Sequence, residues 1–285
     1  MTGATGQLGG ATVEFLLDRV PAKEVAVLVR DPAPASHLAA RGVDVRVGDY
    51  HDRPSLEKAF AGVDKLLLIS APPFGDVITQ HLNAVAAAVR AGVRHVHYTA
   101  TRRRADSPAR ISQVTEWDER TVAALRESGS AVTVLRYPLF LDALPSMLGS
   151  GALTTGLRVP AGQSEAALAT RRDLAEANAA VLAGTGHEGR SYDLGGSEAV
   201  TMAEVAAIVT AASGGEVGYQ DVSVREYVAE RTGEGLPEPV AQFLAEWFTS
   251  LAAGDFAGTS GDLERLIGRK PQTVPEFLVP LCAPA

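Results

Sequence analysis

The stretch Thr2-Gly3-Ala4-Thr5-Gly6-Gln7-Leu8-Gly9, close to the start of the chain, decides the fold. Its glycines recur every third residue. The first allows a tight turn, the second lets the backbone approach a pyrophosphate without an intervening Cβ, and the third lets a following helix pack closely on a sheet. The predicted helix 7–19 then turns free N–H groups and its positive end towards the phosphates. The pattern predicts a dinucleotide site contacted by Gly3, Thr5, Gly6, Gln7 and Leu8, although glycines at this spacing also occur in plain turns.

Short β-branched runs alternate with amphipathic segments over the first two-thirds of the chain. This alternation predicts right-handed βαβ crossovers and an α/β fold with a Rossmann-type, doubly wound parallel sheet. Such sheets bind ligands at the carboxyl ends of their strands, so the site is expected there. The expected strands are 24–29, 43–47, 64–70, 94–99 and 131–136, and the helices between them are 34–41, 55–60, 76–91 and 112–128.

Arg30 ends the strand expected at 24–29, at the position that distinguishes the two nicotinamide dinucleotides. An acidic residue there binds the ribose 2′-hydroxyl of NAD, whereas an arginine suits the 2′-phosphate of NADP. Arg30 therefore favours NADP(H); its alternative is a solvated arginine at a strand end. The neighbouring Asp31, followed by Pro32, is expected to shape the turn.

Other strand ends supply further candidates for the cofactor site. Asp49 and Tyr50 could flank the adenine, or could form a plain loop. Backbone groups of 70–72 could line the nicotinamide ribose, with the same alternative. The cofactor candidates in these segments and after the strand at 131–136 are Asp49, Tyr50, Ser70, Ala71, Pro72, Tyr137 and Pro138.

The acceptor pocket is expected near the ends of the fourth to sixth strands. Its candidate residues are Phe74, Thr99, Thr101 and Phe140, and Tyr137 also lies in this region. The aromatic side chains could stack on a planar ring, or could simply pack in the core or between lobes.

The regular alternation loosens after residue 140. We expect an NADP-binding domain over 1–140, to which a strand near 190–195 returns, and a smaller substrate lobe formed mainly by 141–285. Helices are expected at 171–183 and 201–213.

Bulk properties exclude several classes of function. A formal net charge of −8 argues against nucleic acid as the main partner, and the basic run 102–104 is expected to be a solvated loop. The single cysteine, Cys282, excludes a disulfide framework and a cysteine-based metal site, and fits a reducing cytoplasm. The chain start lacks a signal-peptide pattern, and no apolar run approaches the ~20 residues that span a bilayer.

Together these segments resemble the NmrA-like branch of the atypical short-chain dehydrogenases, and within it the bacterial type 2 NAD(P)H:quinone oxidoreductases and triphenylmethane-dye reductases. The resemblance implies NADP(H) bound by the 3–8 turn and Arg30. It also implies direct hydride transfer to a planar electron acceptor, such as a quinone, held between two lobes, with a homodimer as a possible assembly. The residues that carry it are Thr2–Gly9, Val29–Pro32, Gly48–Tyr50, Lys65–Ser70, Gln80-His81-x-Asn83 and Gly186–Tyr192.

No catalytic residue can be assigned, because the chain lacks the Tyr-x-x-x-Lys pair of typical short-chain dehydrogenases. Tyr98-x-x-x-Arg102 and Tyr227-x-x-x-Arg231 are not substitutes, since arginine does not titrate usefully. A quinone needs only a well-placed hydride donor, because water can supply the protons. The alternative function is a non-catalytic NADP(H) sensor of the NmrA kind that signals by binding a partner protein.

The histidines are expected to be structural. His81 should be a buried hydrogen-bonding residue, and His95 and His97 share a strand face without an acidic neighbour in the sequence, so no metal site is expected.

The chain departs from its relatives at three places. Ala100 and the segment 136–142 alter the expected acceptor pocket. Only Met1 precedes the glycine turn, where relatives carry an apolar strand, so we expect either an upstream start or different pairing at this point.

Overall fold

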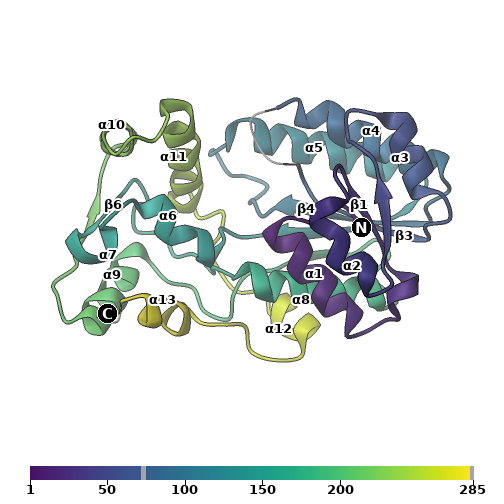
Figure 1. Cartoon of the computed structure of the whole chain (residues 1–285). Coiled ribbons are helices and arrows are strands. Elements are labelled where there is room, and N and C mark those ends of the chain that lie inside the picture. Colours follow the sequence, from purple (N-terminus) through teal and green to yellow (C-terminus); the bar gives the residue numbers. More distant parts are fainter. Residues whose placement is uncertain (72–74, 283–285) are drawn as a thin grey trace. The chain divides into compact units, whose positions relative to one another are not determined.

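The computed structural model describes residues 1–71 and 75–282. The chain forms two compact units, each assembled from several segments (Figure 1). Among the described residues, no helix is both long and apolar enough to cross a membrane. Unit 1 consists of Met1–Thr101, Gln113–Arg136 and Arg171–Tyr192, and unit 2 of Arg102–Ser112, Tyr137–Thr170 and Asp193–Ala285.

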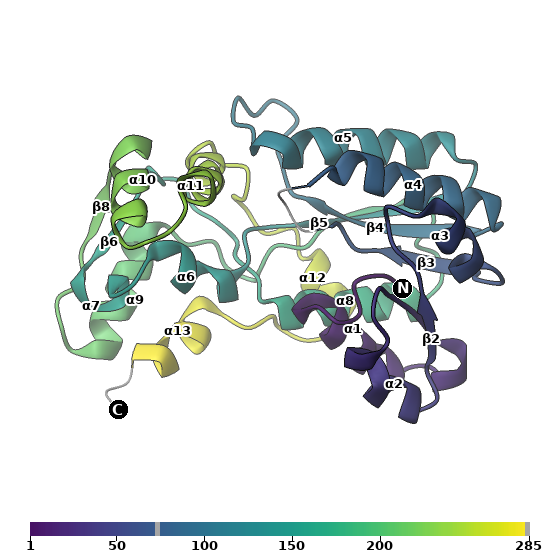
Figure 2. The ribbon, with the colours of Figure 1, turned by 45° about the horizontal axis from the view of Figure 1, so that its top comes forward.

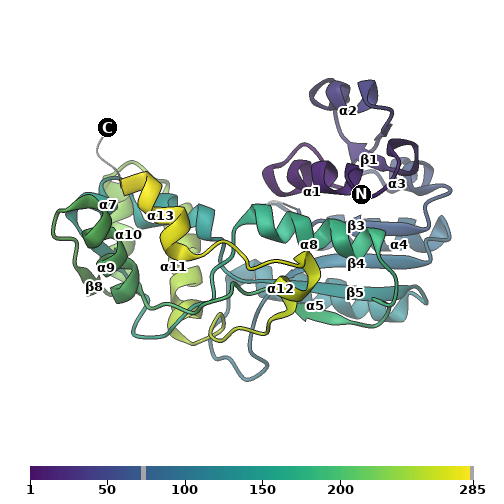
Figure 3. The same ribbon diagram turned by 90° about the horizontal axis from the view of Figure 1, so that it is seen from below.

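Parallel strand pairing organises unit 1 and confirms the expected α/β fold. Strand β1 (Ala26–Val29) pairs in parallel with β2 (Asp44–Val47), and β3 (Lys65–Leu68) pairs in parallel with β4 (His95–Thr101). The second group continues through β5 (Ala131–Tyr137) to β7 (Ser191–Asp193), and Figure 3 shows β3, β4 and β5 side by side.

The first two residues join the two groups of strands. The carbonyl oxygen of Met1 accepts a hydrogen bond from the amide of Leu28 on β1 at 2.9 Å. The amide of Thr2 donates to the carbonyl oxygen of Leu67 on β3 at 3.0 Å. The glycine turn that follows is therefore held between β1 and β3.

Helices cover both faces of the β3–β4–β5 sheet. Helices α3, α4 and α5 lie over one face, and α1 and α8 over the other (Figure 2). Apolar side chains of β3, β4, α3 and α4 meet in a buried core that includes Leu56, Leu66 and Val96. The helices of unit 1 are α1 (Gln7–Leu17), α2 (Ser36–Ala40), α3 (Arg53–Phe60), α4 (Val77–Arg90), α5 (Ser112–Glu127) and α8 (Arg171–Ala183), with short 3₁₀ turns at Ala22–Glu24 and Ala33–Ala35.

Local sequence explains where these helices begin and end. Helix α4 starts after Asp76, whose side chain accepts from the amide of Thr79, and stops before Gly92, which has a φ of +74°. Helix α3 begins two residues before the expected residue 55. Pro54 in its first turn explains the difference, because a missing N–H has no cost there.

Unit 2 is mostly helical. The predicted helix 201–213 is confirmed as α9 (Met202–Ser213), which starts with a capping box between Thr201 and Glu204. The other elements are a 3₁₀ turn (Leu141–Ala143), α6 (Leu144–Leu148), α7 (Ala152–Thr155), β6 (Leu157–Val159) paired in parallel with β8 (Tyr219–Asp221), α10 (Val224–Gly233), α11 (Glu238–Ala252), α12 (Asp262–Ile267) and α13 (Val274–Cys282).

Arg102 and Arg103 are half-buried rather than solvated, contrary to expectation, whereas Arg104 is exposed as expected. Arg102 donates to the carbonyl oxygen of Ala257 at 2.5 Å, and Arg103 to that of Ser107 at 2.5 Å. The buried carboxylate of Asp255 accepts from the amide of Arg104 at 3.0 Å and from the Ser107 hydroxyl at 2.9 Å. Arg102 and Arg103 thus supply donors to loop carbonyls within unit 2.

Candidate active site

The glycine turn has the tight geometry that its spacing predicts. Gly3 has a φ of +66°, which favours glycine, and its carbonyl oxygen accepts from the amide of Gly6 at 3.0 Å. A Cβ on Gly9 would lie only 2.0 Å from that same carbonyl oxygen. Glycine is therefore required at both positions by the packing of the turn itself.

Gly6 differs, because the protein leaves room beside it. A Cβ there would meet only the Gly3 carbonyl oxygen, at an ordinary 3.4 Å. Gly6 is exposed, has an extended φ of −84° and ψ of 167°, and stands at the N-cap of α1 without a side-chain cap. The backbone N–H groups of the first turn therefore remain available, beside the exposed Thr5 and Gln7. An exposed, uncapped helix N-terminus at a glycine is suited to an anionic group.

Arg30 follows directly after β1, and its side chain is exposed. The next residue behaves as the sequence predicts, because an Asp31 carboxylate oxygen accepts from the amide of Ala33 at 3.0 Å and so shapes the turn. Of Arg30 and Asp31, Arg30 is thus the residue whose charged group is placed to bind a ligand.

Asp49 and Tyr50 follow β2 after Gly48 and are half-buried. An Asp49 carboxylate oxygen accepts from the amide of His51 at 2.8 Å, a local turn contact. The Tyr50 hydroxyl donates to the carbonyl oxygen of Ile69 at 3.0 Å, and burial raises the pKa of Tyr50 above its usual range. These contacts tie the loop after β2 to the loop after β3.

The loop after β3 is held by two side chains from other elements. The amide of Ser70 donates to the Thr99 hydroxyl at 2.9 Å, and the amide of Ala71 donates to Nε2 of His81 at 3.0 Å. Thr99 is buried, and its hydroxyl supports the loop from within. Its contact with an acceptor stays a prediction. Pro72 and Phe74, both predicted for the site, lie outside the described residues.

His81 is confirmed as a buried hydrogen-bonding residue. It is fully buried, and desolvation lowers its pKa to about 4, so it is neutral at physiological pH.

A carboxyl group on α5 adds a feature that the sequence analysis missed. Asp118 accepts from the Tyr98 hydroxyl at 2.6 Å and from the amide of Thr101 at 2.8 Å, and burial raises its pKa to about 6. Thr101, a predicted acceptor contact, is thereby fixed at the end of β4. No pattern singled out Asp118, because an acidic residue on an amphipathic helix resembles a solvated one.

The remaining candidates belong to unit 2. Tyr137 and Pro138 are buried, Phe140 is half-buried, and the rings of Tyr137 and Phe140 lie 6.0 Å apart between centroids. Their roles in binding stay predictions, as do those of the unit 1 residues.

His95 and His97 on β4 lie close to each other and to an acidic residue, Glu188, that the sequence did not place beside them. The rings of His95 and His97 lie 3.9 Å apart, and Glu188 lies 3.7 Å from Nδ1 of His95. Within residues 1–71 and 75–282, no group of three or more potential metal ligands is arranged to hold an ion.

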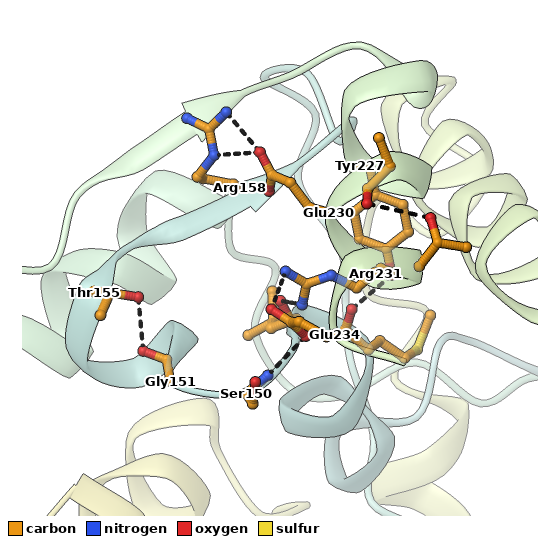
Figure 4. A network of polar contacts seen from close by, with 12 residues as sticks. Ser150, Gly151, Thr155, Arg158, Tyr227, Glu230, Arg231 and Glu234 are labelled. Atoms are coloured by element: carbon orange, nitrogen blue, oxygen red, sulfur yellow. Dashed lines mark hydrogen bonds and ion pairs between the residues drawn. The ribbon is translucent and has the colours of Figure 1, made fainter. Parts of the chain in front are cut away.

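Neither Tyr-x-x-x-Arg pair is arranged as a proton donor. The Tyr227 hydroxyl donates to the carbonyl oxygen of Met147 at 2.6 Å, and burial raises the pKa of Tyr227. Arg231, also buried, binds the carbonyl oxygen of Leu148 and pairs with Glu234 (Figure 4). This pair holds the end of α6 to α10. Tyr98 is fully buried and donates to Asp118.

Comparisons with known proteins agree over nearly the full length of the chain. Quinone oxidoreductase 2 of Escherichia coli is 38% identical over 282 residues, which cover 97% of this chain and 96% of the relative. An NAD(P)H azoreductase of Xenophilus azovorans is 31% identical over 280 residues, covering 97% and 95% of the two chains.

Solved structures give the same result. The NADPH complex of the Escherichia coli NADPH-dependent quinone oxidoreductase superposes with a TM-score of 0.90 at 37% identity and covers 98% of each chain. The NADP(H) complex of a Citrobacter triphenylmethane reductase gives 0.88 at 37% identity and covers 99% of this chain and 98% of the other. The sequence also matches the profile of the NmrA-like family over residues 1–278. The chain therefore belongs to the NmrA-like family.

Proposed function

We propose that this protein is an NADPH-dependent reductase that transfers hydride directly to quinones or similar planar electrophilic acceptors. The glycine turn carries the proposal. Gly6 stands at the exposed N-terminus of α1, which has no side-chain cap. The packing of the protein does not require glycine at this position, whereas close approach of the backbone to a pyrophosphate would. The acceptor class follows from the relatives, which are named for the reduction of quinones, azo compounds and triphenylmethane dyes.

NADP(H) would lie along the ends of β1, β2 and β3. The α1 N-terminus would bind the pyrophosphate, and Arg30 the 2′-phosphate. The loops at 49–50 and 70–72 would border the adenine and the nicotinamide ribose, with Tyr137 and Pro138 at the nicotinamide end. Bound NADPH would supply the hydride. The protein would orient the nicotinamide and exclude water, without a proton-donating tyrosine.

Thr101 and the aromatic residues Phe74 and Phe140 remain the proposed contacts of the acceptor. A substrate lobe formed mainly by 141–285, a homodimer and a cytoplasmic location are further parts of the proposal. The single cysteine suits a reducing compartment.

The direct test follows NADPH oxidation at 340 nm with benzoquinones and triphenylmethane dyes as acceptors. We expect NADPH consumption that depends on both protein and acceptor. Saturable NADP(H) binding without turnover on any acceptor would instead support a sensor.

A pair of glycine variants isolates the cofactor site. Gly6→Ala adds a methyl group that the fold can accommodate at 3.4 Å, yet it would stand between the backbone and the pyrophosphate. Gly10→Ala, one turn along α1 with the same 3.4 Å clearance, is the matched control. We expect both variants to keep the melting temperature and only Gly6→Ala to lose NADPH affinity, by about tenfold or more. Equal affinity in the two variants would contradict the placement of the pyrophosphate.

A further inference from the structure

Helix α4 carries two polar side chains that bind the backbone of two different loops. Nε2 of His81 accepts from the amide of Ala71 after β3, and Nδ2 of Asn83 donates to the carbonyl oxygen of Tyr50 after β2, each at 3.0 Å. These are the two loops proposed to border the nicotinamide ribose and the adenine. One helix thus reaches both halves of the proposed cofactor site.

The hydrogen bonds around His81 allow only one arrangement of its protons. The Thr121 hydroxyl donates to the carbonyl oxygen of Trp117 at 2.6 Å, so its oxygen can accept from Nδ1–H of His81 at 3.0 Å. The Tyr98 hydroxyl, 3.4 Å from Nδ1, has likewise donated its proton elsewhere, to Asp118. Nδ1 is therefore the protonated nitrogen, and Nε2 is left with the lone pair that the amide of Ala71 requires.

This arrangement determines what the loop can offer to a ligand. The amides of Ser70 and Ala71 are both engaged, with Thr99 and His81 respectively. The Ser70 hydroxyl is also engaged, because it lies 3.4 Å from the same Nε2 of His81. With both amides and this hydroxyl engaged, the stretch offers a ligand chiefly carbonyl oxygens, which accept hydrogen bonds and so suit ribose hydroxyls rather than phosphate.

Asn83 has the corresponding place beside the other loop. Its amide group fixes the carbonyl oxygen of Tyr50, and the Tyr50 hydroxyl in turn donates to the carbonyl oxygen of Ile69 at 3.0 Å. Displacement of Asn83 would therefore first move the loop after β2, whereas displacement of His81 would first move the loop after β3.

We infer that His81 and Asn83 are positioning residues, through which α4 sets the backbone of the nicotinamide-ribose loop and the adenine loop respectively. The inference rests on the proposed function, because that function places the cofactor along these loops. Neither side chain needs to touch the cofactor.

The test for His81 compares three variants. His81→Leu removes the acceptor for Ala71, whereas His81→Gln can place an amide oxygen near the position of Nε2. His97→Leu is the matched control, because His97 is an equally buried histidine in unit 1 without a contact to either loop among those described. We expect His81→Leu to lower kcat about tenfold or more and to raise the deuterium isotope effect with 4-deuterated NADPH. His81→Gln should recover much of this loss, and His97→Leu should keep kcat within about twofold.

The test for Asn83 separates the two loops. Asn83→Leu should raise the KM for NADPH about fivefold, the equivalent of one hydrogen bond, with kcat within about twofold. The inference is wrong if His81→Leu and His97→Leu change kcat and the isotope effect alike, or if Asn83→Leu acts on kcat as His81→Leu does.

A measurement without turnover keeps the inference distinct from the proposed function. Hydrogen exchange of the peptide that contains Ala71 should be faster in His81→Leu than in wild type and unchanged in His97→Leu. If wild type oxidises no NADPH with any acceptor, the proposed function fails, while exchange and NADP⁺ affinity still decide the positioning roles. Unchanged exchange at Ala71 in His81→Leu would overturn them.

Discussion

A methyl group on Gly9 would lie 2.0 Å from the carbonyl oxygen of Gly3 and 2.6 Å from its carbonyl carbon. Backbone atoms cannot give way as a flexible side chain can, so Gly9→Ala should force the turn apart. We expect a loss of about 1–3 kcal/mol in the free energy of unfolding, together with weaker NADPH binding. Urea titration and cofactor fluorescence measure the two effects, and Gly10→Ala again serves as the control. A stable Gly9→Ala protein would show that the turn is not packed as described.

We expect Arg30 to determine the choice between NADPH and NADH. An exposed guanidinium after β1 can pair with a 2′-phosphate, which NADPH has and NADH lacks. Arg30→Gln should therefore raise the KM for NADPH about tenfold or more and leave the KM for NADH within about twofold. Steady-state kinetics with both cofactors measure this. An equal loss for both cofactors would place the 2′-phosphate elsewhere.

At the scale of the element, helix α10 holds the C-terminal end of α6. Tyr227→Phe removes the hydrogen bond from its hydroxyl to Met147 without removing the ring, which packs against Phe248 at 5.5 Å between centroids. We expect the free energy of unfolding to fall by about 1 kcal/mol, with kcat unchanged. Chemical denaturation and the 340 nm assay measure the two. A large fall in kcat at unchanged stability would instead implicate Tyr227 in proton transfer.

The elements of unit 1 were predictable because local chemistry and tertiary packing agree there. A buried apolar run marks β3, and Asp76 and Gly92 mark the ends of α4. In α10 only Tyr227 and Arg231 are buried, so the sequence of this helix shows no apolar stripe from which the helix could be predicted. Periodicity carries no signal when a helix packs through one aromatic ring and one paired arginine.

The candidate site likewise contains features that local sequence predicts and contacts that depend on tertiary packing. The tight geometry of the glycine turn, the place of Arg30 at the end of β1 and the burial of His81 could be predicted, because each depends on a local motif or a familiar residue preference. The ligands of the turn and of Arg30 stay predictions. The contact of Asp118 with Thr101 and that of Asn83 with Tyr50 join residues far apart in the sequence. Such contacts follow from strand order and helix packing, which the sequence of one chain does not specify residue by residue.

At the scale of the whole molecule, buried histidines make stability depend on pH. Burial lowers the pKa of His81 to about 4 and that of His97 to about 3, from an ordinary 6.5. Between pH 6.5 and 4 the unfolded chain therefore binds protons that the folded chain does not, and the free energy of unfolding falls as the pH falls. The pKa of Asp118 is raised from 3.8 to about 6, so this group increases the free energy of unfolding as the pH falls. One carboxyl group then acts against two histidines, and we expect the effect of the histidines to be larger.

We expect each of these histidines to contribute up to about 1.4 kcal/mol per pH unit in this window. Urea titrations at several values between pH 7 and 4 measure the slope, and His97→Leu should make it shallower. A free energy of unfolding that rises on acidification would show that Asp118 dominates instead.

The alternation of the chain between its two units constrains how the protein can be made. Six segments alternate between them, so the polypeptide passes from one unit to the other five times. During synthesis on the ribosome, unit 1 lacks α8 until residue 183 has emerged and lacks the first two residues of β7 until residue 192 has emerged. An N-terminal half therefore cannot complete unit 1, and a fragment that stops at residue 140 would expose the face of α1 that α8 covers. Nascent chains of that length should expose this face to chaperones, and chains long enough to include α8 should cover it.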